Sequence, residues 1–237
     1  MKIEGITPLV LTYNEAINIG RVLDQLTWAT EVLVIDSLSN DATKAIATQY
    51  PNVRFLERPF DTHAAQWQYG HDQVQSEWVL SLDADYILRK KAPDELRRLP
   101  EDSVVNGYEA SFTYCIYETE LSASLYPPRV VLYRKSAARY IQDGHTQRLI
   151  VEGEVGTLKT TILHDDRKRM DHWLASQQKY ARLEAQKLAS MTWKDMSIAQ
   201  KIRWLRIPAI LVMPLYCLFG KGLIFQGAAG WFYTWQI

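Results

Sequence analysis

Residues 78–85 have the sequence Trp78-Val79-Leu80-Ser81-Leu82-Asp83-Ala84-Asp85. An apolar run bounded by polar residues is typical of a central strand of a parallel sheet, which is buried on both faces. Ligands of open α/β sheets bind beyond the carboxyl ends of the strands, where Asp83 and Asp85 stand. Side chains two residues apart on an extended chain point the same way, so both carboxylates can converge on one divalent cation. Such a cation commonly serves phosphate-bearing substrates. The alternative to a cation site is a strand-end turn in which the aspartates cap a loop.

On the N-terminal side of this stretch, strand patterns alternate with helix patterns. The expected strands are 6–11, 32–35 and 53–56, and the expected helices are 17–26, 42–47 and 64–75. Asn14 and Asp41 precede the first two helices and are expected to cap them. This alternation predicts βαβ units and a mostly parallel sheet.

The pattern changes after Asp85. A short helix is expected at 93–99 and an amphipathic helix at 171–191. Segments rich in β-branched and aromatic residues predict strands at 108–117, 129–133 and 160–163, and residues 142–147 are expected to form a polar loop.

The composition limits the class of protein. The chain has 237 residues, of which 47% are hydrophobic and 23% charged, as in a globular protein with one domain and an appendage. Its formal net charge is zero, which argues against a nucleic-acid-binding protein. The two cysteines, Cys115 and Cys217, form no C-x-x-C pattern, and no secretory signal is visible. We therefore expect the catalytic part to lie in the cytoplasm.

Charge is distributed unevenly toward the C-terminus. From Arg167 to Arg206, Lys and Arg outnumber Asp and Glu, and residues 207–235 then carry a single charge, Lys221. A basic stretch that leads into an apolar one is typical of a membrane-surface element. Residues 207–219 are too few, and with two prolines too broken, for a simple span. We therefore expect in-plane or re-entrant helices, with a core helix pair that has a solvated basic face as the alternative.

Several enzyme classes are excluded by the loops that follow the strands. The loop after the first strand has neither G-x-G-x-x-G nor G-x-x-x-x-G-K-[ST], which argues against a dinucleotide-binding fold and a P-loop enzyme. A haloacid-type phosphatase would carry its aspartates on the first strand, and a sugar nucleotidyltransferase would have a Gly- and Arg-rich loop there. Asp36 ends the second strand, where an acidic residue commonly binds ribose hydroxyls or a base edge, or is simply a turn residue.

Three motifs occur in order, and together they resemble glycosyltransferase family 2. They are Leu11-Thr12-Tyr13-Asn14-Glu15, Val34-Ile35-Asp36-Ser37-Leu38-Ser39-Asn40-Asp41-Ala42-Thr43 and Leu82-Asp83-Ala84-Asp85. The resemblance implies the GT-A fold, a Rossmann-like, mostly parallel sheet flanked by helices. Within the family, the chain is similar to bacterial glucosyltransferase-like proteins of the lipopolysaccharide core and surface polysaccharides. We expect a catalytic domain at 1–165 and a helical, basic then apolar, membrane-associating tail at 166–237.

The resemblance also implies roles for residues of the nucleotide pocket. Asp36 would contact the ribose or the base, Asp83 would face the ribose or support the site, and Asp85 would be the main ligand of a divalent metal, manganese or magnesium. The metal would neutralise charge on the leaving nucleoside diphosphate. The residues expected to line the pocket beside them are Thr12, Tyr13 and Glu15.

An inverting transfer needs a general base on the face opposite the leaving group. Asp143 is the predicted base, on a loop in which Gly144 permits a tight turn. Gln147 stands where a carboxylate is expected in the family, and the alternative for Asp143 is a loop cap.

Histidines and arginines complete the predicted site. His145 and His164 are both candidates for a second metal ligand, and His164 fits because it follows a predicted strand. His145 would alternatively hydrogen-bond the acceptor or orient Asp143. Arg129 and Arg134 would bind pyrophosphate of the donor or of a lipid-linked acceptor, since guanidinium forks suit phosphate; plain surface residues are the alternative.

The expected function is metal-dependent, inverting transfer of a hexose from a nucleotide sugar, UDP-linked, to a hydroxyl of a surface glycan or lipid-linked saccharide. The expected location is the cytoplasmic face of a bacterial inner membrane, with peripheral or re-entrant attachment through the tail. Two alternatives stay open: a polyprenol-phosphate glycosyltransferase, and a catalytically weak, membrane-docked binding subunit of polysaccharide assembly.

Overall fold

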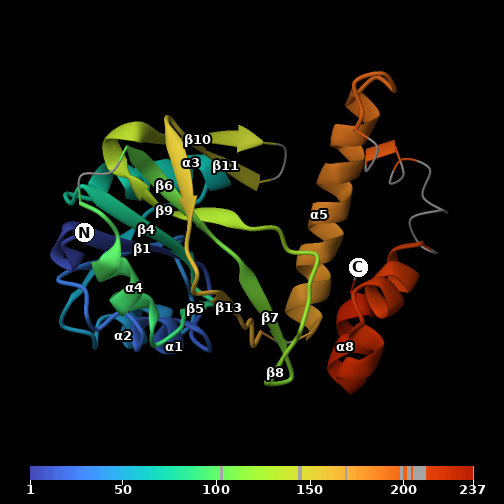
Figure 1. Cartoon of the computed structure of the whole chain (residues 1–237), viewed down its shortest axis with the longest axis horizontal. Coiled ribbons are helices and arrows are strands. Elements are labelled where there is room, and N and C mark those ends of the chain that lie inside the picture. The colour runs from blue at the N-terminus through green and yellow to red at the C-terminus, as the bar shows by residue number, and fades with distance from the viewer. Residues whose placement is uncertain are drawn as a thin grey trace. The chain divides into compact units, whose positions relative to one another are not determined.

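The computed structural model describes residues 1–101, 104–143, 146–168, 170–197, 200–201, 204 and 212–236. The chain divides into two compact units (Figure 1). Unit 1 comprises Met1–Phe112 and Pro127–Arg167, and unit 2 comprises Thr113–Tyr126 and Lys168–Ile237. The predicted boundary at residue 165, between a catalytic domain and a membrane-associating tail, stays a prediction.

Unit 1 is built on a seven-stranded sheet in the order β12-β6-β9-β4-β1-β2-β3. Neighbouring strands are parallel except where β9 runs antiparallel to β4 and β6. The predicted mostly parallel sheet is therefore confirmed. The strands are β1 Ile6–Thr12, β2 Val32–Asp36, β3 Val53–Glu57, β4 Trp78–Asp83, β6 Val105–Ala110, β9 Arg129–Arg134 and β12 Glu154–Thr157.

The core explains why the central strands are apolar runs. Strands β1, β2 and β4 are buried along nearly their whole length, as a sheet covered on both faces requires. Leu9, Leu33 and Val79 from these three strands form one cluster with Trp67 and Tyr133. Burial of such apolar side chains supplies most of the free energy that stabilises the sheet.

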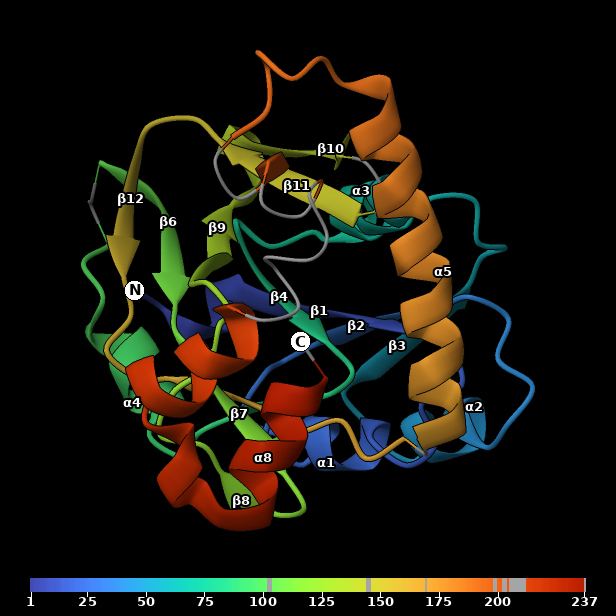
Figure 2. The same cartoon turned by 90° about the vertical axis from the view of Figure 1, so that its right-hand side faces the viewer.

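Helices cover the two faces of this sheet (Figures 1 and 2). Helix α3 (His63–Gln73) and the hairpin of β10 (Ala138–Asp143) and β11 (Thr146–Val151) lie on one side. Helices α1 (Ile19–Leu23), α2 (Thr43–Ala47) and α4 (Ala92–Arg98) lie on the other. The remaining short elements of unit 1 are η1 Ile3–Gly5, η2 Lys135–Ala137, β5 Tyr86–Leu88 and β13 Ile162–His164.

Helix α3 begins and packs as its sequence dictates. The hydroxyl of Thr62 accepts a hydrogen bond from Ala65 N (3.1 Å), which caps the helix. Gly70 faces the sheet, and a Cβ atom at this position would lie 2.6 Å from Leu9 Cδ1. The glycine therefore allows α3 to approach β1 closely.

Two predicted caps differ in detail from the structure. Asn14 does not cap α1, because it has a left-handed backbone (φ 54°) and its side-chain oxygen accepts a hydrogen bond from Asn40 N. The helix starts at Ile19, with Asn18 at its N-cap position. Asp41 does accept a hydrogen bond from Thr43 N (2.9 Å), although the cap position itself falls on Ala42.

The predicted polar loop at 142–147 is wrong, because Gln142 and Asp143 end β10 and Thr146 and Gln147 begin β11. The strand signal lies in Tyr140, Leu149 and Val151, which pack against the core beside α3 and alternate with Ile141 and Ile150. The predicted strand 108–117 is likewise two strands, β6 and β7 (Phe112–Ile116).

Unit 2 combines a short hairpin with helices. The hairpin pairs β7 with β8 (Thr119–Glu120), and the helices are α5 Met170–Ser190, η3 Tyr216–Gly220, η4 Leu223–Gln226 and α8 Gly227–Trp235. Leu121 packs with Cys217, Leu223 and Tyr233 in a small apolar cluster. The predicted helix 171–191 is present as α5, whereas most of 198–211 lies outside the described residues.

Within the described part of the chain, no individual helix has the length and apolar character to cross a membrane. One pair of segments, Val212–Gly220 and Leu223–Trp235, reaches that length and composition when taken together, but it is bent by 75°.

Candidate active site

The D-x-D segment lies where the chain passes from β4 of the seven-stranded sheet to β5 (Tyr86–Leu88), which belongs to another sheet. Strand β4 ends at Asp83, a tight turn contains Asp85, and β5 then pairs antiparallel with β13 so that Tyr86 faces His164. Asp165 N donates a hydrogen bond to Asp85 O (3.0 Å). As a result, His164 Nε2 lies 3.2 Å from Asp85 Oδ2. The structure thus brings together two side chains that the sequence predicts as metal ligands.

The charges in this cluster are tightly coupled. Burial, and then the nearby negative charge of Asp85, raises the pKa of Asp83 to about 6, against the opposing effects of His164, Arg129 and Tyr86. Burial lowers the pKa of His164, but the attraction and hydrogen bond of Asp85, together with the charges of Asp83 and Asp166, outweigh burial and raise the pKa overall. Two carboxylates are therefore held close together where water is scarce, which favours binding of a cation.

The donor set fits a small divalent cation that is also held by substrate. Two ligand atoms about 2.1 Å from one ion at a right angle are about 3 Å apart, close to the Asp85–His164 separation. Among the described residues, no three His, Cys, Asp or Glu side chains gather closely enough to hold a metal by themselves. This agrees with ions such as Mg²⁺, which commonly use one or two carboxylates together with substrate phosphates.

A second group of polar residues lies at the ends of the neighbouring strands. Thr12 and Asp36 are partners in the β1–β2 register, and Thr12 Oγ1 donates a hydrogen bond to Asp36 Oδ1 (2.7 Å). Ser39 donates from its backbone N to Asp36 Oδ2 (2.7 Å) and from its hydroxyl to Oδ1 (2.6 Å). The buried Asp36 carboxylate therefore fixes the loop after β2, as the alternative prediction of a turn residue expects.

The two loops beside Asp36 have strained backbones. Asn14 and Leu38 both have left-handed φ angles, 54° and 61°. Such conformations are uncommon for residues with side chains and gather at functional sites. Asn14 N donates to Ser39 Oγ (2.8 Å), so the two loops are joined.

The predicted pocket residues of the first loop point in different directions. Tyr13 is 53% exposed and can offer its ring to a ligand. Glu15 is turned inward, where its carboxylate accepts a hydrogen bond from Asn18 Nδ2 (3.0 Å). Glu15 thus belongs to a network that holds the loop in place.

The two predicted arginines lie at opposite ends of β9. Because β9 is antiparallel to β4, Arg129 begins β9 near the carboxyl end of β4, where it lowers the pKa of Asp83. Arg134 ends β9 opposite Trp78, with its guanidinium 4.8 Å from the indole centroid and ion-paired with Glu77. The structure therefore brings Arg129 to the site and corrects the prediction for Arg134, which lies at the far edge of the sheet.

The predicted base, Asp143, lies at the end of β10 rather than on a loop. Its neighbour Gln142 accepts a hydrogen bond from Ala64 N in the first turn of α3 (3.2 Å). Since α3 begins shortly after β3 ends, this end of the hairpin lies at the same sheet edge as Asp85. Gln147 pairs with Gln142 across the hairpin. Gly144 and His145 lie outside the described residues.

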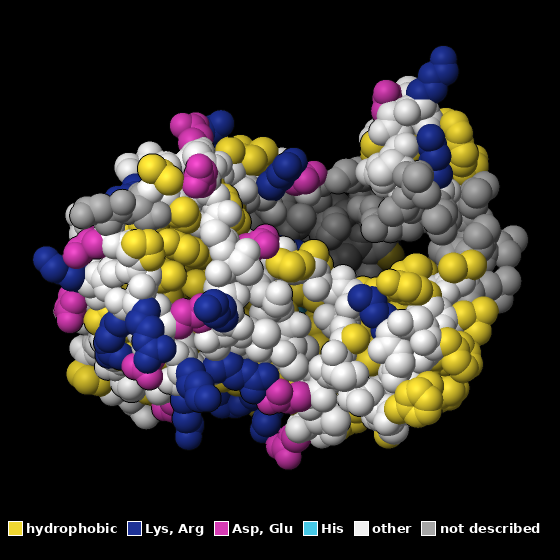
Figure 3. Space-filling model, in the orientation of Figure 1, with side chains coloured by type: hydrophobic (Ala, Val, Ile, Leu, Met, Phe, Trp, Pro, Cys, Tyr) yellow, Lys and Arg dark blue, Asp and Glu magenta, His cyan; other side chains and the backbone are white. Residues whose placement is uncertain are grey.

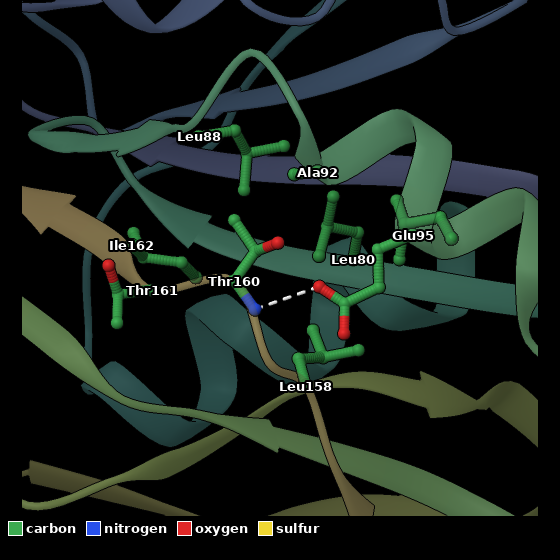
Figure 4. Close-up of a pocket in the computed structure, with 9 residues that line it drawn as sticks. Leu80, Leu88, Ala92, Glu95, Leu158, Thr160, Thr161 and Ile162 are labelled. Atoms are coloured by element: carbon green, nitrogen blue, oxygen red, sulfur yellow. Dashed lines mark hydrogen bonds between the residues drawn. The ribbon is translucent and has the colours of Figure 1, made fainter.

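A small cavity between β4, α4 and the segment before β13 carries no ligand-binding features. It has a volume of about 10 Å³ and lies between Leu80, Leu158 and Ile162, with Glu95 at its side (Figure 4). Glu95 accepts a hydrogen bond from Thr160 N (2.8 Å), which ties α4 to the segment before β13. A space of this size holds at most one water molecule, so we regard it as part of the core packing.

Comparison with known proteins agrees with this arrangement. Residues 9–114 match the family model of Glycosyl transferase family 2. The lipopolysaccharide core biosynthesis glycosyltransferase LpsC of Rhizobium meliloti is 26% identical over 189 residues, which are 76% of this chain and 70% of LpsC. Against an uncharacterized glycosyltransferase of Rickettsia felis, the chain spans 33% of the relative's length.

Solved structures share the fold at low sequence identity. S. aureus TarS in complex with UDP-GlcNAc has a TM-score of 0.57 at 13% identity, covering 97% of this chain and 79% of the TarS chain. The mannosyltransferase PcManGT from Pyrobaculum calidifontis, in complex with GDP-Man and Mn²⁺, has a TM-score of 0.53 at 15% identity, covering 94% and 75%.

The sheet and these neighbours show the GT-A fold. The matching family model and the LpsC relative indicate the class of enzyme, which the fold alone does not. Both support a glycosyltransferase of the family 2 type.

Proposed function

We propose that this glycosyltransferase transfers a hexose from a nucleotide sugar, UDP-linked, to a hydroxyl group of a surface glycan or lipid-linked saccharide, with inversion and with a divalent metal. The observation that carries the proposal is the group of Asp83, Asp85 and His164 at the sheet edge that also holds Asp36. Further support comes from the name of LpsC and from the nucleotide sugars and Mn²⁺ in the neighbouring structures.

Asp85 and His164 would hold the metal, and a bound metal neutralises charge that develops on the leaving diphosphate. Asp83 adds negative charge beneath that position, and Arg129 supplies a fork of N–H donors for the diphosphate. The loops fixed by Asp36 shape the place for the nucleoside.

Asp143 would accept the proton of the acceptor hydroxyl as that oxygen attacks the anomeric carbon. The bond from the anomeric carbon to the phosphate oxygen breaks on the opposite face, and the nucleoside diphosphate leaves with its electron pair. Attack on that face inverts the configuration at the anomeric carbon. The place of Asp143 at the edge that carries Asp85 supports this role.

The experiment that tests the reaction is release of nucleotide from UDP-, GDP-, ADP- and dTDP-sugars, with manganese, magnesium or EDTA. We expect metal-dependent release from one donor and its loss in Asp85→Ala. The matched control is Asp94→Ala, which removes an exposed carboxylate paired with Arg97 on α4. If nucleotide binds with metal but no sugar is ever transferred to any acceptor, the binding-subunit alternative replaces the enzyme for this chain.

We also propose that unit 2 attaches the enzyme to the cytoplasmic face of the bacterial inner membrane. Residues 168–237 contain ten Lys and Arg against three Asp and Glu, and five of the eight tryptophans. Large apolar side chains are exposed along η3, η4 and α8, including Phe219 (65%), Phe225 (87%) and Trp235 (65%). Figure 3 shows hydrophobic side chains gathered over this end of the chain. Aromatic residues beside basic ones suit the headgroup region of an anionic bilayer.

Attachment is tested by sedimentation with vesicles of phosphatidylcholine alone or mixed with phosphatidylglycerol. We expect binding to the anionic vesicles that weakens with salt and is lost in the double variant Phe225→Asp/Trp235→Asp. The control is Phe60→Asp, which changes an exposed aromatic residue of unit 1. Equal sedimentation of both variants would contradict the assignment of this surface.

A further inference from the structure

Asn18 is a polar residue with no exposed surface at the start of α1. Its side chain does not cap the helix. Instead, Asn18 Nδ2 donates to Glu15 Oε2 and to Asp166 Oδ1, both at 3.0 Å. Asn18 Oδ1 accepts from Arg21 Nη1 (3.3 Å) and from Arg167 N (3.2 Å). An amide side chain has two donors and two acceptor sites, so all four are used here.

Arg21, one turn further along α1, reinforces the same connection. Its Nη1 donates to Asp165 O (3.1 Å), and its Nη2 forms an ion pair with the buried Asp165 carboxylate. Arg167 Nε also reaches that carboxylate (3.3 Å). The first helix of the chain and the segment 165–167, more than 140 residues later, are thereby joined by side chains and backbone together.

The joined segment directly follows His164. On one side it is held by the D-x-D turn, through Asp165 N to Asp85 O and through the Asp85–His164 contact. On the other side it is held by Asn18 and Arg21. His164 therefore has a fixed place against Asp85 because the residues after it are anchored to α1.

We propose that Asn18 is a positioning residue of the active site. Its amide orients Glu15 on the loop after β1 and, through Asp166 and the backbone of Arg167, holds His164 at the metal position. The proposal rests on the proposed metal-dependent function, and it makes a structural claim about a residue that touches neither metal nor sugar. Groups that orient metal ligands typically contribute 10–100-fold to metal affinity.

The test measures Mn²⁺ binding by electron paramagnetic resonance in the presence of UDP, with the whole chain. The variants are Asn18→Ala and Asn18→Asp. Aspartate fills the same space and keeps acceptors for Arg21 and Arg167, but it faces the carboxylates of Glu15 and Asp166 with a negative charge. We expect both variants to bind Mn²⁺ about 10–100-fold more weakly than the wild type. The Mn²⁺ concentration that gives half-maximal transfer should rise by the same factor.

The matched control is Asn52→Ala. Asn52 Nδ2 also donates two hydrogen bonds, to Leu26 O (3.1 Å) and Ala29 O (3.0 Å), but it lies at the amino end of β3. Its loss should lower the melting temperature and leave Mn²⁺ affinity unchanged. If Asn18→Ala fails to fold, Arg21→Lys keeps the charge, loses the two-pronged contact with Asp165, and should weaken Mn²⁺ binding in the same direction.

The outcomes separate the two claims. A wild type that binds Mn²⁺, with Asn18 variants that bind it equally well, overturns the positioning role and leaves the proposed function in place. A wild type that binds no Mn²⁺ with UDP present overturns the metal-dependent function and the positioning role together. Weaker binding in the Asn18 variants but not in Asn52→Ala supports the proposal.

Discussion

The central sheet has one edge at the amino ends of its parallel strands (the amino edge) and one at their carboxyl ends (the carboxyl edge). These two edges use charged and polar residues in opposite ways. At the amino edge, Arg134 pairs with Glu77 and covers Trp78, and Lys135 Nζ donates to Val74 O, so charges there have partners within the protein. At the carboxyl edge, Asp83 and Asp85 are held together and the pKa of Asp83 is raised by burial and by its neighbour. The first arrangement stabilises the fold, whereas we propose that the second is completed by a ligand.

The largest effect is expected at the carboxyl edge, for Asp143→Asn. Removal of a general base should lower the transfer rate by about two to four orders of magnitude and leave donor binding intact. The measurement is the steady-state rate with a hydroxyl acceptor. Arg139→Gln, on the same strand but ion-paired with Glu152, is the control and should keep full activity.

An Asp143→Asn enzyme with an unchanged rate would contradict transfer to a hydroxyl. It would favour the polyprenol-phosphate alternative, because a phosphate acceptor needs little help from a base.

The two ends of β9 allow a paired comparison of smaller size. Arg129→Gln should raise the KM for the donor about tenfold or more, since hydrogen bonds to charged groups contribute about 1.5–3 kcal/mol. Arg134→Gln should leave KM unchanged and lower the free energy of unfolding by about 1 kcal/mol, as expected for a cation–π contact. Donor kinetics and urea unfolding of both variants check this, and an equal rise in KM for both would remove the distinction between the edges.

The smallest effect concerns the pH dependence of stability near the amino edge. His71 lies in α3, stacked on Tyr133, and burial lowers its pKa, with smaller opposing and supporting effects of Asp72 and Lys135. The unfolded chain therefore takes up a proton near pH 6.5 that the folded protein still excludes. Stability should be complete above that pH and fall as the pH decreases, by at most about 1.4 kcal/mol per unit.

Urea unfolding between pH 5 and 8 tests this, with His71→Gln as the comparison because glutamine does not titrate. The variant should lose less stability than the wild type on acidification. Parallel pH profiles for the two proteins would show that His71 makes no contribution.

The sequence was most informative where one element carries both burial and chemistry. The apolar run of β4 identified the buried strand, and its aspartates identified the edge. Placing His164 beside Asp85 also succeeded, because a histidine at a strand end beside the D-x-D needs only one strand pairing to reach it.

The sequence was less informative where a residue's place depends on tertiary contacts. Arg129 and Arg134 lie at opposite ends of β9, and the direction of β9 decides which of them reaches the carboxyl edge. No local signal in the sequence shows that β9 is antiparallel to β4. The hairpin of β10 and β11 was not predicted, because the polar residues where its two strands meet are typical of a loop. The role of Asn18 was not predicted, because its partners Asp166 and Arg167 are far away along the chain.

Unit 2 is assembled from two pieces of the chain, which has a consequence for the order of biosynthesis. Leu125 N donates to the hydroxyl of Tyr233, 108 residues later, and Leu121 packs with Cys217 and Leu223. At about 5–20 residues per second, a ribosome needs roughly 5–20 s to add the missing partners. During that interval residues 113–126 have already been synthesised, but helix α8, against which they pack, has not. A chaperone that protects apolar segments of nascent chains would find its binding site there.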